Sequence, residues 1–278
     1  MSGYEEISEM TCPECYSERV EGRDYGRIEH VLYHSEITGR ERGMNVVFPP
    51  GYDDNLDKSY PVLYYAHGMF GNEHVMLDDK NYKIVEILVN LAAAGKTREM
   101  IVVFPNIYVS KDPDMQPGFS IDTVGPYDDF IQELIQVVDP YVTAHYRTLT
   151  GRENRFVFGF SMGAREALYI GMSRPDLFAY VGGAAPTPGL IPGKDWAMEH
   201  PGMFTDENFR VADKGVDLKL LMFCVGEKDS VVGKFPIHYH EVLVENGVDH
   251  LWYLIPGVEH DERLVRSSIY NFAIRLMD

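Results

Sequence analysis

The pentapeptide Gly159-Phe160-Ser161-Met162-Gly163 limits the possible folds of this chain more than any other stretch of its sequence. It follows an apolar, strand-like run at 155–158, and the residues after it, 164–170, favour a helix. The order strand, G-x-S-x-G and helix is typical of a nucleophile elbow, a tight turn that lifts the serine hydroxyl out of a sheet. The alternative is a plain turn whose serine caps the helix. We expect Ser161 to be a nucleophile at the end of a strand.

The rest of the chain alternates between strand-like and helix-like segments. Continuous apolar runs predict buried strands at 61–66, 100–105, 180–183, 218–225 and 251–255. Helical spacing of apolar residues predicts helices at 81–94, 235–246, 262–276 and 127–146, the last with a kink or break at Pro140. Before them, a hairpin is predicted from strands at 28–35 and 42–48. This alternation predicts an α/β fold, in which helices cover both faces of a mostly parallel sheet.

One domain fits the length of the chain. A chain of 278 residues, 45% of them hydrophobic, is long enough to bury one large core. We find no linker and no internal repeat in the sequence. We therefore expect an amino-terminal arm at 1–25 and a single catalytic domain at 26–278.

Two long segments, 106–125 and 186–216, lack the periodicity of a helix or a strand. Loops of that length in a compact domain are usually functional, so we expect both to form walls of the active-site pocket. Trp196 lies in the second segment. Its ring is a candidate to stack on an aromatic or sugar ring of a substrate, although packing inside the protein is the commoner role of a tryptophan.

The charge of the chain argues against several classes of partner. A formal net charge of -18 at pH 7 disfavours binding to nucleic acid and to anionic membrane surfaces. No apolar run reaches the roughly 18 residues that are needed to span a bilayer. The first residues are acidic and do not resemble a signal peptide. We expect a cytoplasmic protein, or a secreted one if a signal has been trimmed.

The three cysteines do not form a disulfide framework. Cys12 and Cys15 have the spacing of a zinc knuckle, but no second cysteine pair follows, and only His30 and His34 are nearby candidates. We therefore expect two free thiols on the amino-terminal arm and no metal site. Cys224 lies in an apolar run and is expected to be a small core residue.

The loops after two later strands contain an acid and a histidine. In α/β-hydrolases the catalytic residues follow the order serine, acid, histidine, each at the carboxyl end of a strand. Ser161, Asp229 and His260 match that order. Glu227 is the rival acid, and we prefer Asp229 because it lies deeper in its loop and has the shorter side chain. His250 precedes the last strand and is expected to be structural, and Asp261 is set aside because it adjoins His260 in the chain.

Ester hydrolysis also needs donors for the developing oxyanion. The strand predicted at 61–66 runs directly into the turn His67-Gly68-Met69-Phe70-Gly71. We expect the backbone N–H groups of Met69 and Met162 to bind the oxyanion while Ser161 attacks the ester and His260 accepts its proton. Water would then resolve the acyl-enzyme. This chemistry requires no metal and no organic cofactor.

Several segments together resemble the esterase D-like "putative esterase" family, which includes carbohydrate esterase family 1. The segments that carry the resemblance are 47–53, 66–71, 154–163, 174–178, 224–230 and 257–261. They are most similar to the feruloyl esterase domains of bacterial xylanases. The resemblance implies hydrolysis of hydroxycinnamate esters on arabinoxylan, and it supports Asp229 as the acid and Met69 and Met162 as oxyanion donors. Two departures are Ala164 in place of a glycine and the polar segment 262–266 in place of an aromatic one.

Other functions remain open at this point. Within esterases, the alternatives are an acetyl xylan esterase, a thioesterase resembling S-formylglutathione hydrolase, or a siderophore esterase. An acyltransferase resembling mycolyltransferases is less expected, because no segment of the sequence indicates a long groove for a lipid. A binding protein that has lost catalysis is also disfavoured, because candidates for all three catalytic residues are present. The expected partner is a small-molecule or oligosaccharide ester, and the sequence does not predict the oligomeric state.

Overall fold

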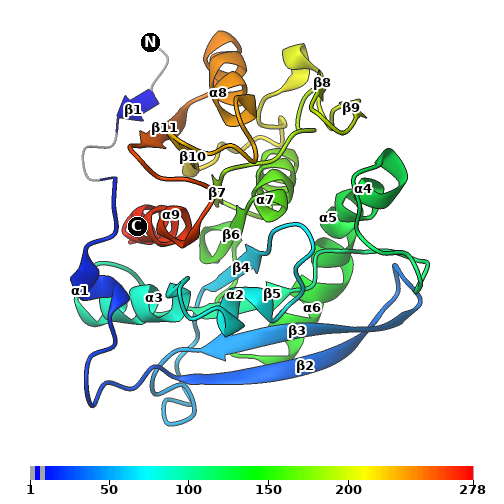
Figure 1. Ribbon diagram of the computed structural model, residues 1–278. Helices are drawn as coiled ribbons and strands as arrows, with labels where there is room; N and C mark the ends of the chain where they lie inside the picture. The colour runs from blue at the N-terminus through cyan, green and yellow to red at the C-terminus, as the bar shows by residue number, and fades with distance from the viewer. Residues whose placement is uncertain (1–3, 7–9, 278) are drawn as a thin grey trace.

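A sheet of nine strands organises the residues that the structure describes, 4–6 and 10–277 (Figure 1). In this computed structural model the strands lie in the order β1 (Tyr4–Glu6), β11 (His250–Ile255), β10 (Leu220–Gly226), β7 (Tyr180–Ala184), β6 (Arg155–Phe160), β4 (Val62–Ala66), β5 (Ile101–Pro105), β3 (Arg40–Phe48) and β2 (Arg27–Ser35). The pairs from β1 to β5 are parallel. The hairpin of β2 and β3 is antiparallel and joins β5. The predicted α/β fold with a mostly parallel sheet is confirmed.

Helices cover both faces of this sheet, and the alternation of side chains along β4 explains why. Val62 and Tyr64 point into one hydrophobic core, and Leu63 and Tyr65 point into the other. The first core is covered by α4 (Ile121–Asp128), α5 (Phe130–Glu133), α6 (Asp139–His145), α7 (Met162–Ser173) and α8 (Phe235–Glu245). The second core is covered by α3 (Ile84–Ala93) and α9 (Glu262–Ala273). Both faces of β4 are therefore buried away from water, as its continuous apolar run predicts.

The irregular segment predicted at 106–125 ends earlier than expected, because α4 begins at Ile121. The hydroxyl of Ser120 accepts a hydrogen bond from the backbone N–H of Thr123 at 3.4 Å, and the Thr123 hydroxyl accepts one from the backbone N–H of Ser120 at 3.2 Å. This is a capping box in which threonine stands where glutamate or glutamine is usual. The sequence pattern therefore did not indicate the start of this helix.

The long helix predicted at 127–146 is divided by a change of helix type. A π-helical turn (Leu134–Val138) separates α5 from α6. Pro140 is the second residue of α6 and directly follows this turn. The helix therefore changes type just before Pro140 and does not break there, because Val138 and Asp139 both keep right-handed helical dihedral angles.

The amino-terminal arm contacts the domain more closely than the sequence indicated. β1 adds a parallel edge strand to the sheet, with Tyr4 beside His250 in the register. The short helix α1 (Glu14–Ser17) packs near α3, where the Asn90 carboxamide donates to the backbone oxygens of Tyr16 and Glu18 at 2.8 Å each. A buried side chain of α3 therefore holds the arm by its backbone.

The three cysteines are all free thiols. Cys224 is fully buried on β10, as expected for a small core residue. Neither Cys12 nor Cys15 belongs to a group of three metal-ligating side chains within the described residues. In the part of the chain that the structure describes, no helix has the length and apolar character of a membrane span.

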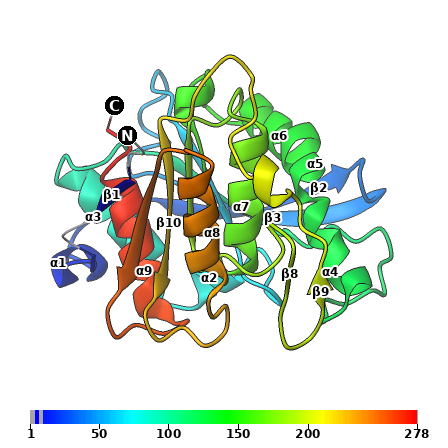
Figure 2. The same cartoon turned by 90° about the horizontal axis from the view of Figure 1, so that it is seen from above.

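Two segments outside the sheet lie together at one end of the molecule. They are α4 and the hairpin formed by β8 (Gly193–Lys194) and β9 (Glu199–His200) (Figures 1 and 2). Phe119, just before α4, contacts Trp196 at the tip of this hairpin, with ring centroids 5.1 Å apart. The two segments therefore meet above the ends of the central strands.

Candidate active site

Ser161 occupies a strained turn between β6 and α7. Its backbone dihedral angles are φ 58° and ψ -118°, a region that residues with a side chain rarely adopt. A Cβ on Gly159 or on Gly163 would approach backbone atoms of Gly163 or of Ala66 more closely than 3.0 Å, so only glycine fits at either position. The backbone N–H of Ser161 donates to the Ala184 oxygen at 2.8 Å. The G-x-S-x-G pattern is therefore required by close packing of the backbone around the serine.

Asp229 and His260 lie together although 30 residues separate them in the chain. Nδ1 of His260 donates to Oδ2 of Asp229 at 2.7 Å. The other oxygen of Asp229 accepts the backbone N–H groups of Val231 and Val232 at 2.9 and 3.0 Å. Because the carboxylate can only accept hydrogen bonds, the ring proton is on Nδ1 and the lone pair of Nε2 is free. This is the tautomer that a general base needs.

The two rival acids have other roles. Glu227 accepts the backbone N–H of Gly257 at 2.8 Å, so its side chain joins two loops. Asp261 caps α9 by accepting the backbone N–H of Arg263 at 3.0 Å. Neither carboxylate is hydrogen-bonded to the imidazole of His260. Among the acids considered from the sequence, the structure brings Asp229 to the histidine.

The two candidate oxyanion donors lie on either side of Ser161. Met162 is the first residue of α7, and the N–H groups of the first turn of a helix have no partner within the helix. Met69 lies in the turn after β4, and a Cβ on its neighbour Gly68 would stand 3.4 Å from the Cβ of Ser161. The next residue, Phe70, has φ 65° and donates its N–H to the Tyr127 hydroxyl at 3.1 Å. The turn is therefore held tightly against the serine.

His67 is a residue whose role sequence reasoning missed. Its ring is buried below the turn, with Nδ1 donating to the Gly68 oxygen at 2.7 Å and Nε2 accepting from the Ile107 N–H at 3.1 Å. Burial lowers the pKa of His67 to about 4. The sequence showed a His-Gly turn but not which partners the ring would meet. A neutral His67 fixes the backbone that presents Met69.

Ser161 and His260 line one cavity of about 630 Å³. Met69 and Met162 line the same cavity. Both irregular segments contribute to its walls, the first through Phe119 and Val124 and the second through residues 187–188, 195–198 and 200, beside residues of the 68–82 segment. The expectation that these segments border the site therefore agrees with the geometry.

Trp196 is exposed over 80% of its surface, so the common case of a packed tryptophan does not apply. It lines the cavity together with Phe119 and Phe70. The Phe119 ring lies between the other two, with centroids 5.1 Å from Trp196 and 5.3 Å from Phe70. The side chains of Phe70 and Phe119 are also more than half exposed. These three rings form an aromatic border at the mouth of the cavity.

A buried charge cluster lies behind the serine, on α7. Arg165 donates to Oε1 of Glu166 at 2.9 and 2.8 Å and also pairs with Asp128 of α4. Oε2 of Glu166 is buried and has no hydrogen-bond partner among the described residues. Burial raises the pKa of Glu166 to about 8, although Arg165 opposes the shift. The sequence showed only a helix-forming stretch here, because both charged residues are common on helix surfaces.

Comparison with known proteins places this geometry among esterases. Residues 35–233 match the model of the family described as "Putative esterase". A curated relative, an endo-1,4-beta-xylanase/feruloyl esterase of Xylanibacter ruminicola, is 31% identical over 164 residues, which is 57% of this chain and 21% of that protein. The chain thus spans about a fifth of that relative's length.

Solved structures are similar over nearly the whole chain. The ferulic acid esterase of Anaeromyces mucronatus, in complex with ferulic acid, is 42% identical with a TM-score of 0.89, and the match covers 97% of each chain. The feruloyl esterase module of Clostridium thermocellum, complexed with sinapinate, is 21% identical with a TM-score of 0.72, covering 99% of this chain and 96% of that one. At that identity the second likeness concerns the fold alone.

Proposed function

This chain belongs to the esterase family that its residues 35–233 match, and on that premise we propose that it is a feruloyl esterase with Ser161, His260 and Asp229 as its catalytic triad. It is a serine carboxylic-ester hydrolase. The proposed substrates are hydroxycinnamate esters of plant cell-wall arabinoxylan, as small molecules or as oligosaccharides. The observation that carries this proposal is the cavity that Ser161 and His260 share with three aromatic rings.

The proposed reaction is a two-step acyl transfer. Oγ of Ser161 attacks the ester carbonyl carbon while Nε2 of His260 takes the hydroxyl proton. The tetrahedral intermediate collapses, and His260 returns that proton to the leaving alcohol. Water, deprotonated by His260, then attacks the acyl carbon, the bond to Oγ of Ser161 breaks, and His260 returns the proton to that oxygen as the free acid leaves. Asp229 keeps the imidazole in the required tautomer throughout, which the 2.7 Å hydrogen bond supports.

Charge develops on the carbonyl oxygen in both steps. We assign its stabilisation to the backbone N–H groups of Met69 and Met162. The loss of one such donor typically costs roughly 3 kcal/mol in the barrier. The first-turn position of Met162 and the tight turn around Met69 support this assignment.

The shape and lining of the cavity favour an aromatic acyl group. An acetyl group would fill only a small part of the cavity of about 630 Å³. Ring-to-ring contacts contribute roughly 0.5–1.5 kcal/mol each beyond the area they bury. We therefore assign to Trp196, Phe119 and Phe70 the binding of an aromatic or sugar ring of the substrate.

A substrate panel tests the proposal. The rates with methyl ferulate, acetylated xylan and S-formylglutathione are measured side by side, with Ser161→Ala as the background. Methyl ferulate is expected to have the highest kcat/KM. A higher value for acetylated xylan would assign the chain to acetyl xylan esterases, and a higher value for the thioester would assign it to S-formylglutathione hydrolases.

A further inference from the structure

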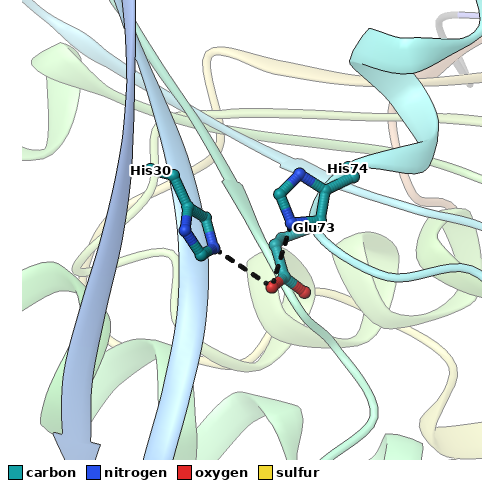
Figure 3. Close-up of side chains that lie close together, drawn as sticks. All are labelled: His30, Glu73 and His74. Atoms are coloured by element: carbon teal, nitrogen blue, oxygen red, sulfur yellow. Dashed lines mark hydrogen bonds and ion pairs between the residues drawn. The ribbon is translucent and has the colours of Figure 1, made fainter.

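A cluster of two histidines and a glutamate lies outside the catalytic cavity. His30 is on the edge strand β2, whereas Glu73 and His74 directly precede α2 (Val75–Asp78) (Figure 3). We propose that His30, Glu73 and His74 bind a divalent transition-metal ion, with Zn²⁺ as the reference case. Among the described residues this is the one group of three such side chains whose ligand atoms all lie within 4.8 Å of one another.

The spacing of the three donors fits a metal better than it fits hydrogen bonding. Oε1 of Glu73 is 3.4 Å from Nε2 of His30 and 3.6 Å from Nε2 of His74. Hydrogen bonds from nitrogen to oxygen are normally about 2.7–3.2 Å long. With zinc bonds of about 2.0–2.2 Å, two ligands of a tetrahedral ion stand roughly 3.3–3.6 Å apart. The two distances from Glu73 match this spacing, and all three ligand atoms lie within 4.8 Å of one another.

Gly43 on β3 provides the space for the carboxylate. A Cβ at this position would collide with Oε1 of Glu73 and would stand 3.0 Å from Nε2 of His30. Gly43 lies inside a strand, where glycine is unfavourable. Its φ is not among the positive values of the chain, so the backbone conformation does not demand glycine. The room that it leaves at the two ligand atoms accounts for its presence.

Neighbouring amides orient the glutamate. Asn106 donates to Oε2 of Glu73 at 3.2 Å, and Asn45 donates to the backbone oxygen of Glu73 at 2.9 Å. The side chain of Glu73 is 12% exposed and the two histidines are about 40% exposed. Glu73 is thus held by two amides beside two accessible imidazole rings.

Metal binding also changes the hydrogen bonding of His74. Nδ2 of Asn45 lies 3.0 Å from Nδ1 of His74, where it donates to the unprotonated nitrogen. Coordination through Nε2 places the ring proton on Nδ1, as is usual for ligating histidines. Asn45 then loses this contact but keeps its bond to the Glu73 oxygen. The loss of this hydrogen bond makes metal binding weaker than at a site whose histidines already have the required tautomer.

The position of the site indicates what the ion would do. Glu73 and His74 lie between Gly71 and Val75, which both line the catalytic cavity. An ion would therefore tie the turn that carries Met69 to the edge hairpin of the sheet. We assign the ion a positioning and stabilising role, because none of its ligands lines the cavity that holds Ser161.

Zinc binding to the chelator-treated protein tests the proposal, with calorimetry as the readout. One site is expected. His30→Ala and Glu73→Gln should each weaken the dissociation constant by at least about 10-fold. Zinc should also raise the thermal midpoint of the wild type but not that of His30→Ala. His30 is exposed on an edge strand, so its loss should leave the fold intact.

Two matched controls separate this site from adventitious binding. His34→Ala removes an exposed histidine from the same strand, and Cys15→Ser removes an exposed thiol. Both variants should bind zinc like the wild type. The proposal is overturned if the wild type binds no zinc, if His30→Ala binds it unchanged, or if a control variant loses binding to the same extent. Because the readout is metal binding, this result is independent of the substrate panel.

Discussion

Nε2 of His67 accepts a hydrogen bond from the backbone N–H of Ile107 at 3.1 Å. The opposite nitrogen donates to the Gly68 oxygen, so the ring satisfies both partners only while it is neutral. A second proton would place two donors face to face in a buried position. Burial, which penalises the charged ring, is the main cause of the low pKa of His67. The turn beside Ser161 thus depends on an uncharged histidine.

The stability of the protein should therefore fall in acid. In the unfolded chain His67 takes up a proton near pH 6.5, but in the folded protein only near pH 4. Between these pH values the unfolded state binds more protons than the folded state. The contribution of neutral His67 to the free energy of unfolding is therefore complete above pH 6.5 and is lost as the pH falls towards 4. The full effect is about 3 kcal/mol at about 1.4 kcal/mol per pKa unit.

Urea unfolding of the wild type and of His67→Gln checks this, because glutamine offers a donor and an acceptor but does not titrate. The difference in unfolding free energy between the two proteins should shrink from pH 7 to pH 4. A difference that is constant with pH would mean that His67 is not the group responsible.

Substitution of Ser161 should separate catalysis from strain. Ser161→Ala is expected to lower kcat with methyl ferulate by on the order of 10⁴-fold or more. Ser161→Gly should be equally inactive but more stable by about 1 kcal/mol, because glycine adopts φ 58° without strain. Steady-state kinetics and thermal unfolding measure the two effects. Retained hydrolysis in either variant would refute Ser161 as the nucleophile.

The carboxylate of Asp229 should matter far more than that of its neighbour. Asp229→Asn is expected to reduce kcat by roughly 10⁴-fold, since an amide can hold the imidazole in the wrong tautomer. Glu227→Gln is the matched control, because it removes a carboxylate from the same loop that bonds to Gly257 instead. Comparable losses in the two variants would argue against Asp229 as the triad acid.

Glu166 should make the protein less stable as the pH rises. Burial raises the pKa of this carboxyl in the folded state to about 8, whereas in the unfolded chain it ionises near 4.5. Between these values the folded state binds more protons, so stability decreases with increasing pH. Glu166→Gln cannot ionise and should therefore gain stability relative to the wild type between pH 5 and 8. Parallel stability curves for the two proteins would contradict this.

Trp196 should contribute to substrate binding and not to folding. Trp196→Ala is expected to change the unfolding free energy by less than about 0.5 kcal/mol, since the side chain is 80% exposed. The variant should lose roughly 2- to 10-fold in kcat/KM with methyl ferulate, which is the value of one ring contact. With ethyl acetate, which has no ring, the rate should stay the same. An equal loss with both esters would indicate a distorted site.

Local sequence patterns indicated where the candidate site residues lie in the fold. Ser161, Asp229 and His260 each come after an apolar run that forms a strand. Parallel strands bring their carboxyl ends to one edge of the sheet. What the sequence could not show are meetings between distant segments. His67 with Ile107, Arg165 with Asp128, and β1 with β11 depend on packing of the whole chain. The exposure of Trp196 likewise depends on where the β8–β9 hairpin ends.

The candidate catalytic residues and the residues around the mouth of the cavity come from different parts of the fold. Ser161, Asp229 and His260 are attached to strands of the sheet, whereas α4 and the β8–β9 hairpin lie outside it. If the proposed function holds, reactivity and selectivity are therefore encoded in separate stretches of the gene. Exchange of residues 119–124 or 193–200 with those of a related enzyme should redirect the enzyme to another ester without disturbing its chemistry. The architecture makes this scaffold well suited to the diversification of substrate range by loop grafting.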